Sequence, residues 1–129
     1  MFEASSILTR DVVTVREDTP ILEAVRVLAE NDITGVPVVS DDMTLVGIIS
    51  EKDVLRLLYE EGAKNAVVRD YMTHNVVSFS EDTPLYDICE SLINNGFRRI
   101  PILRDGKIAG IISRSDIIKF ILKVRASTH

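Results

Sequence analysis

Two short Ser-x-x-Asp strings are the residues of this chain whose types and spacing could do chemistry. They stand at Ser50–Asp53 and Ser113–Asp116. At a helix start this spacing is typical of a capping box, in which the serine and the acidic side chain bond each other's backbone amides. The same carboxylate could instead accept two hydrogen bonds from a ribose diol, while free amides of the helix start receive a phosphate. The residues alone leave both interpretations open, and the two are compatible.

A second candidate is the basic pair Arg98-Arg99, which directly precedes the apolar segment Ile100–Leu103. One interpretation is a surface ion pair with Asp87 or Glu90, which would stabilise the fold little. The other is a phosphate clamp, because a planar guanidinium can hold two phosphate oxygens at once. In that case the arginines would add anion binding to the carboxylate chemistry of the second Ser-x-x-Asp string.

The other reactive side chains form no recognisable catalytic or metal-binding set. His74 and His129 are far apart in sequence and have no cysteine or carboxylate at ligand spacing. Cys89, the single cysteine, falls on an apolar helical stripe, which predicts a core position rather than a nucleophile. The chain also lacks a glycine-rich phosphate loop. We therefore predict no metal site, no required cofactor and no enzymatic activity.

The candidate strings recur because the chain contains an internal repeat. Pro37 corresponds to Pro101 at a spacing of about 64 residues, and Gly47 corresponds to Gly110 after a one-residue gap. A repeat of this length is a whole supersecondary unit. Each copy is too small to bury an adequate core alone, so we expect the two copies to pack together about a pseudo-two-fold axis.

Each copy predicts the element order β-α-β-β-α, which gives an α+β fold of α/β-type repeats. In the first copy we expect strands at 12–15, 36–39 and 45–49, a helix opened by Thr19 and Pro20, and a last helix from Ser50 to Gly62. The second copy predicts strands at 76–79, 100–103 and 108–112 with equivalent helices. The repeats then span residues 7–62 and 72–123, and 63–71 connects them.

Composition narrows the class of protein. The chain has 129 residues, of which 46% are hydrophobic and 27% charged, as expected of a globular domain rather than a disordered segment. Its net charge of −5, without a basic run, argues against nucleic-acid binding. The N-terminal residues lack the features of a secretory signal, and the single cysteine fits a reducing compartment. We therefore predict a cytoplasmic protein.

The ordered motifs of each copy resemble the cystathionine β-synthase (CBS) domain. These motifs are Thr-Pro before a helix, Val/Ile-Pro in a strand, and Gly-Ile-Ile-Ser-x-x-Asp, which stands at 47–53 and 110–116. The pairs Leu8-Thr9 and Met72-Thr73 also resemble the family, and the resemblance covers roughly residues 7–123. It implies a tandem CBS pair, or Bateman module, that binds AMP, ADP, ATP or an S-adenosylmethionine-type ligand and signals to a partner protein.

The resemblance also implies two ligand sites in the cleft between the copies. The main site would contain Asp116, Ser113, Ser115, Arg98, Arg99, Thr9, Val13, Ile33 and Thr34, and the second site Asp53, Ser50, Lys52, Thr73, Val77 and Phe97. Because Thr34-Gly35 stands where the second copy has Arg98-Arg99, we predict stronger phosphate binding at the Asp116 site.

The terminal helices of the two copies are apolar on more than one side, which predicts a homodimer. Leu57, Leu58, Phe120 and Ile121 contribute to this pattern, and similar modules dimerise through these helices. An alternative to the ligand-binding module is a structural interaction subunit whose cleft is empty and whose Ser-x-x-Asp strings are caps only. A nucleic-acid binder or an enzyme acting on a nucleotide has less support in the residues.

Overall fold

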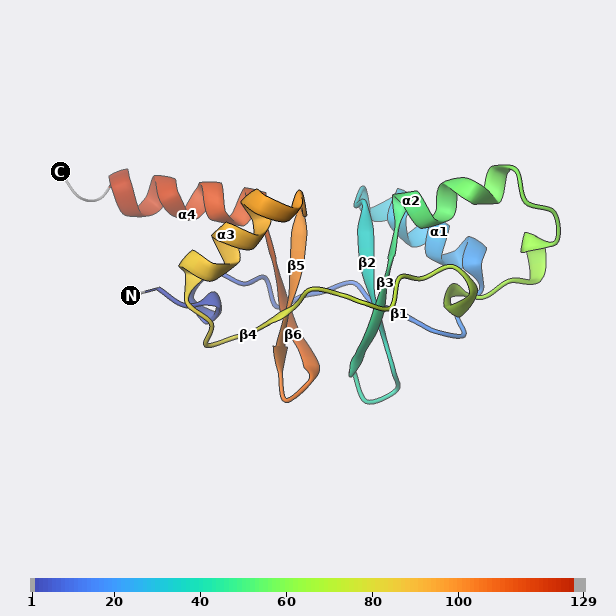
Figure 1. The fold of residues 1–129 in the computed structure, drawn as a ribbon, viewed down its shortest axis with the longest axis horizontal. Coiled ribbons are helices and arrows are strands. Elements are labelled where there is room, and N and C mark those ends of the chain that lie inside the picture. Colours follow the sequence, from blue (N-terminus) through green and yellow to red (C-terminus); the bar gives the residue numbers. More distant parts are fainter. Residues whose placement is uncertain (1, 127–129) are drawn as a thin grey trace. The chain divides into compact units, whose positions relative to one another are not determined.

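The computed structural model describes residues 2–126 of the chain, and Figure 1 shows its ribbon. The chain forms two compact units. One is Val13–Val76, and the other combines Met1–Val12 with Val77–His129. The compact units are therefore not the same division of the chain as the two sequence repeats.

The unit Val13–Val76 contains a three-stranded mixed sheet and two helices. Its elements are β1 (Val15–Arg16), α1 (Ile21–Asn31), β2 (Gly35–Val39), β3 (Leu45–Ser50) and α2 (Glu51–Leu55). The sheet has the order β1-β2-β3, in which β1 is parallel and β3 antiparallel to β2. Both helices lie on one face of this sheet (Figure 1).

The other unit repeats this arrangement. It contains β4 (Phe79–Ser80), α3 (Leu85–Asn95), β5 (Arg99–Arg104), β6 (Lys107–Ser113) and α4 (Arg114–Ala126). The strand order is β4-β5-β6, again with one parallel and one antiparallel pair. The predicted α+β fold with two β-α-β-β-α repeats is confirmed.

The apolar helical stripes form the cores. In α1 the buried residues are Ile21, Ala24 and Leu28, at the spacing expected for one face of a helix. The equivalent stripe of α3 packs on the β5–β6 hairpin, together with the half-buried Cys89 and the α4 residues Ile117 and Phe120. The predicted core position of Cys89 is thus confirmed, and burial raises the pKa of its thiol.

Two predicted element boundaries are wrong. The strands expected at 12–15 and 76–79 begin only at Val15 and Phe79, because only two residues of each pair with the neighbouring strand.

The start of the first helix also differs from the prediction. The helix α1 begins after Pro20, and Thr19 does not cap it. The Thr19 hydroxyl instead accepts a hydrogen bond from the Arg16 amide at 3.0 Å, which closes the turn between β1 and α1.

The last helix of the first copy is also shorter than predicted. It ends at Leu55 and continues only as a 3-10 turn, Arg56–Leu58, rather than reaching Gly62. None of its residues is fully buried, so packing contributes little to extending it. Gly62 adopts a φ of +81°, and a further 3-10 turn, Ala63–Asn65, follows it.

Two segments that precede the first strands, β1 and β4, complete the two units. We call residues 2–9 the N-terminal strap and residues 66–73 the connector strap. In the N-terminal strap, the Phe2 carbonyl accepts the Leu85 amide at 2.8 Å, and Thr9 exchanges two backbone hydrogen bonds of 2.9 Å with Ile111 of β6. Ala4, in the 3-10 turn Ala4–Ser6, is fully buried against the same core.

The connector strap makes the equivalent contacts in the other unit. The Ala66 carbonyl accepts the Ile21 amide at 3.0 Å, and Thr73 exchanges backbone hydrogen bonds of 2.8 and 2.9 Å with Ile48 of β3. Val68, in the 3-10 turn Val68–Asp70, is the buried residue. Each unit is therefore completed by the segment that precedes the other copy in sequence.

Candidate functional site

The string Ser113–Asp116 lies where β6 ends and α4 begins. The Ser113 amide donates to Asp116 Oδ2 at 2.9 Å, and the Asp116 amide donates to Ser113 Oγ at 3.1 Å. These reciprocal bonds form a capping box, so the capping interpretation is confirmed. Both side chains remain partly exposed, and the box fixes the orientation of the carboxylate.

Capping leaves most of the Asp116 carboxylate available to a ligand. A carboxylate has about four lone-pair positions. Within residues 2–126, Asp116 receives one hydrogen bond, from the Ser113 amide. The group can therefore cap its helix and still accept both hydroxyls of a diol.

The equivalent carboxylate, Asp53, is more fully engaged. Its Oδ2 accepts the Ser50 amide at 2.8 Å and the Ser50 hydroxyl at 2.9 Å. Its Oδ1 accepts the Thr73 hydroxyl at 3.3 Å. The two Ser-x-x-Asp strings thus form the same kind of helix cap. The Asp53 carboxylate, however, has fewer free acceptor positions than the Asp116 carboxylate.

The two arginines lie next to the Asp116 capping box. Arg99 opens β5 and pairs with Ser113 of β6, and Arg98 precedes it with an exposed side chain. Across residues 2–126 neither guanidinium forms an ion pair, and Glu90 instead accepts the Tyr86 hydroxyl at 2.9 Å. The surface ion-pair interpretation therefore has no support, and both positive charges are available to an anion.

Arg114 is a structural residue that the sequence reasoning did not identify. Its guanidinium donates to the carbonyls of Phe97 at 2.8 Å and Leu92 at 3.2 Å, and its amide donates to the Arg98 carbonyl at 3.1 Å. These bonds fix the segment that carries Arg98 to the start of α4. The sequence offers one signal for this role of Arg114: the first copy has Glu51 at the equivalent position, so the two copies differ here.

The structure assigns each remaining predicted site residue to a unit. Thr9 lies in the unit of Asp116, through its pairing with Ile111, and Thr73 lies in the unit of Asp53. Thr9 thus shares a unit with Asp116, although in sequence it precedes the strands of the first copy. Thr73 shares a unit with Asp53, although in sequence it precedes the strands of the second copy. Grouped with Asp116 are Arg98, Arg99, Ser113, Ser115, Val77 and Phe97, and grouped with Asp53 are Ser50, Lys52, Val13, Ile33 and Thr34.

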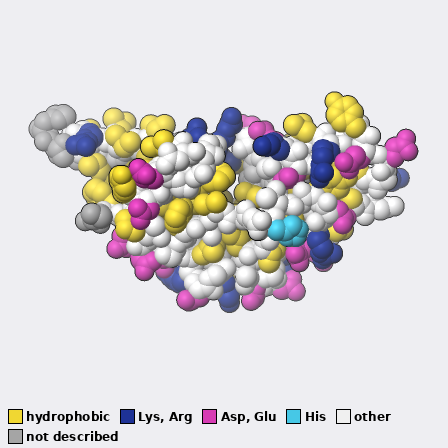
Figure 2. Space-filling view, viewed as in Figure 1, with side chains coloured by type: hydrophobic (Ala, Val, Ile, Leu, Met, Phe, Trp, Pro, Cys, Tyr) yellow, Lys and Arg dark blue, Asp and Glu magenta, His cyan; other side chains and the backbone are white. Residues whose placement is uncertain are grey.

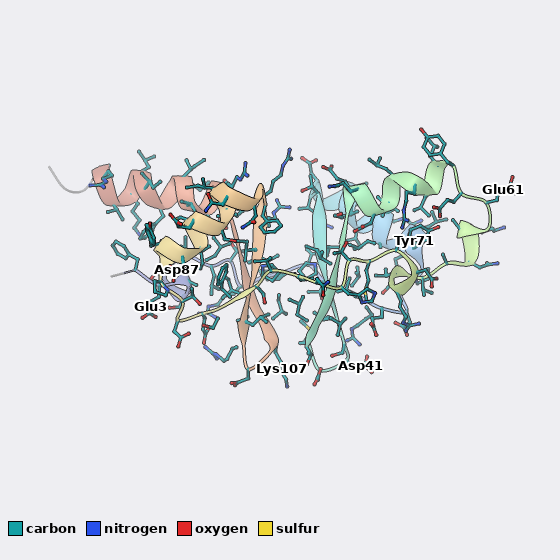
Figure 3. The ribbon with its side chains drawn as sticks, in the orientation of Figure 1. Glu3, Asp41, Glu61, Tyr71, Asp87 and Lys107 are labelled. Atoms are coloured by element: carbon teal, nitrogen blue, oxygen red, sulfur yellow. The ribbon has the colours of Figure 1, made fainter. Side chains whose placement is uncertain are left out.

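A cavity of about 410 Å³ in the unit Val13–Val76 contains none of the predicted site residues. Tyr71, labelled in Figure 3, donates a hydrogen bond to Glu60 at 2.7 Å, which raises the pKa of the phenol. The Arg56 guanidinium lies 5.0 Å from the centre of the Tyr71 ring. With Glu61 and Asp70 in the lining, carboxylates outnumber the single arginine. The cavity is thus a poor match for a phosphate.

Further classes of site receive no support from residues 2–126. No group of histidine, cysteine and acidic side chains in this range could hold a metal ion, and His129 lies outside it. Within the same range, every helix is too short or too polar to cross a membrane.

Comparison with known proteins gives a consistent result. The family model for the CBS domain matches the chain twice, at residues 4–60 and 68–123. The protein MJ1225 of Methanocaldococcus jannaschii is 34% identical over 123 residues, which are 95% of this chain and 44% of that protein. The chain therefore spans less than half the length of this relative.

Two solved structures with bound ligands are similar over almost the whole chain. CBSX2 from Arabidopsis thaliana, in complex with AMP, has a TM-score of 0.87 and 30% identity, covering 97% of this chain and 99% of that one. The CBS domain pair of MJ0100, in complex with 5'-methylthioadenosine and S-adenosyl-L-methionine, has a TM-score of 0.78 and 26% identity. It covers 93% of this chain and 99% of that one. All three of these ligands contain an adenosyl group.

Proposed function

This chain belongs to the CBS-domain family, and we propose that it is a regulatory module that binds an adenosyl ligand and signals to a partner protein. The observation that carries the proposal is the Asp116 carboxylate, which is held in place by its capping box and receives only one hydrogen bond within residues 2–126. A fixed carboxylate of this kind suits a ribose diol. The adenosyl ligands of CBSX2 and MJ0100 point to the same chemistry.

In this proposal the ligand is recognised in two parts. The ribose hydroxyls donate to Asp116, and Arg98 or Arg99 binds a phosphate attached to the ribose. Ser115, exposed in the first turn of α4, supplies a further hydroxyl near the helix start. Because two arginines carry positive charge here and a sulfonium is also cationic, we rank AMP, ADP and ATP above S-adenosylmethionine.

A thermal-shift panel tests the proposed function. We expect AMP, ADP or ATP at 100 times its dissociation constant to stabilise the chain by about 2.7 kcal/mol, which moves the melting midpoint by several degrees. Adenosine, which keeps the ribose and lacks the phosphate, should give a smaller shift. Absence of a shift with all four compounds and with S-adenosylmethionine, confirmed by calorimetry, would contradict the proposal.

The double variant Arg98→Ala/Arg99→Ala is the matched control for the phosphate. It should reduce the shift with AMP to that with adenosine and leave the adenosine shift unchanged, because only the phosphate contacts are removed. Equal loss for both ligands would indicate a damaged site rather than a missing clamp.

We also propose that the module is a homodimer formed through its terminal helices. The α4 residues Ile118 and Leu122 are 66% and 70% exposed, and hydrophobic side chains gather along α4 in Figure 2. Leu58 and Tyr59, which follow α2, are 82% and 83% exposed. Burying such apolar side chains against a second copy would stabilise both chains.

Light scattering measures the expected assembly. We expect twice the mass of one chain at micromolar concentration, and the mass of one chain for Leu122→Glu, since an unpaired carboxylate in an apolar interface is costly. A single-chain mass for the unaltered protein would refute the dimer.

The competing proposal is a ligand-free interaction subunit that keeps the same dimer. It treats both Ser-x-x-Asp strings as caps only, and a stable dimer with no response to any adenosyl compound would favour it. The absence of catalysis, the partner protein and the cytoplasmic location remain predictions of the sequence under either proposal.

A further inference from the structure

We propose that the Thr73 hydroxyl regulates the second adenosyl site by competing with the ribose for Asp53. This inference rests on the proposed function and on the second site, at Asp53, that the resemblance to the CBS domain implies. The Thr73 hydroxyl donates to Asp53 Oδ1 at 3.3 Å. The Asp53 site is then occupied by the protein's own side chain.

Counting acceptor positions shows why the competition matters. Asp53 receives the amide and hydroxyl of Ser50 on Oδ2 and the Thr73 hydroxyl on Oδ1. Of about four lone-pair positions on a carboxylate, one remains, whereas a ribose diol requires two. One bound hydroxyl must therefore leave before Asp53 can accept both ribose hydroxyls, and the Thr73 hydroxyl, which has the longer bond of the two, leaves both positions of Oδ1 to the diol.

The backbone keeps Thr73 beside Asp53 while leaving its side chain able to turn. Thr73 exchanges backbone hydrogen bonds of 2.8 and 2.9 Å with Ile48, next to Gly47, where a Cβ would lie 2.8 Å from the Thr73 carbonyl oxygen. Release of the hydroxyl needs only a change of the Thr73 side-chain rotamer. The competition is thus a modest and reversible effect on affinity.

The other unit provides the comparison. Thr9 forms the same backbone pairing, with two bonds of 2.9 Å to Ile111. Within residues 2–126, however, Asp116 receives one hydrogen bond, which comes from Ser113 and not from Thr9. Asp116 can accept a diol as it stands, so the Asp116 site fills first and the Asp53 site fills only after Thr73 is released.

Calorimetric titration with AMP in an Asp116→Ala background isolates the Asp53 site. Adding Thr73→Val, which removes the hydroxyl and keeps the shape of the side chain, should tighten AMP binding by about threefold to tenfold, because a 3.3 Å bond is long and therefore weaker than an ordinary bond from a hydroxyl to a carboxylate. Thr73→Ser keeps the hydroxyl and should bind AMP as the background does. Thr44→Val, a hydroxyl removed elsewhere in the same unit, should also change nothing.

The outcomes separate this inference from the proposed function. Weaker AMP binding after Thr73→Val would make Thr73 a ligand contact and overturn the competition. Unchanged affinity, including no detectable binding with or without the substitution, would overturn it as well. AMP binding by the unaltered chain tests the proposed function independently, because that binding takes place first at Asp116.

Discussion

Replacement of Gly110 by alanine is expected to lower the Tm by roughly 10 °C and to loosen the N-terminal strap. A Cβ at Gly110 would lie 2.7 Å from the backbone oxygen of Thr9 and would also overlap the Leu8 side chain. Because a backbone oxygen cannot rotate away, the strap itself must move from β6. Overpacking of this kind costs about 3 kcal/mol, which corresponds to roughly 10 °C in a chain of this size.

Gly35→Ala is the matched control for this prediction. Gly35 also lies in a strand, but its Cβ would meet no atom closer than 3.7 Å, an ordinary contact distance. Its Tm should stay within about 2 °C of the unaltered protein, measured by circular dichroism or calorimetry. If Gly110→Ala melts like Gly35→Ala, the close approach of the strap to β6 is not important for stability.

Much of the fold could be predicted because its signals are local. The apolar spacing of Ile21, Ala24 and Leu28 indicates one helical face, and the structure buries all three residues. Ser113 and Asp116 are three positions apart, which suffices to predict the capping box that forms. Such features depend on neighbours in the chain, so a single sequence contains them.

The straps could not be predicted, because their contacts are largely backbone hydrogen bonds, which depend little on the identity of the side chain. Phe2 and Ala66 share no chemistry, yet their carbonyls accept equivalent amides, those of Leu85 and Ile21. Any residue can supply a backbone carbonyl. The repeat in sequence therefore becomes visible only near Leu8, whereas the repeat in structure already includes Phe2.

The difference between the Asp53 and Asp116 sites could likewise be predicted only in part from the sequence. The exchange of Thr34-Gly35 for Arg98-Arg99 is visible in the sequence and predicts unequal phosphate binding. The bond from Thr73 to Asp53 is not visible, because an equivalent threonine, Thr9, precedes the other copy. Which hydroxyl reaches a carboxylate is decided by rotamers, on which the repeat pattern gives no information.

Asp116→Ala is expected to weaken AMP binding by more than about 100-fold in calorimetry. Two hydrogen bonds from a ribose to a charged carboxylate would be lost, each contributing about 1.5–3 kcal/mol. The substitution also removes half of the capping box of α4, at a cost of about 1 kcal/mol. The protein should therefore remain folded, with a slightly lower Tm, so that the loss of affinity can be measured directly.

Two further variants separate the charge of Asp116 from its cap. Asp116→Asn keeps an oxygen that can accept the Ser113 amide and should retain the Tm, yet it should still lose much of the affinity because the negative charge is gone. Asp70→Ala removes a carboxylate that accepts the Val67 amide at 3.0 Å, a cap outside the proposed site, and should leave affinity unchanged. Full AMP affinity in Asp116→Ala would show that the Asp116 carboxylate is a cap only and that AMP is bound by other residues.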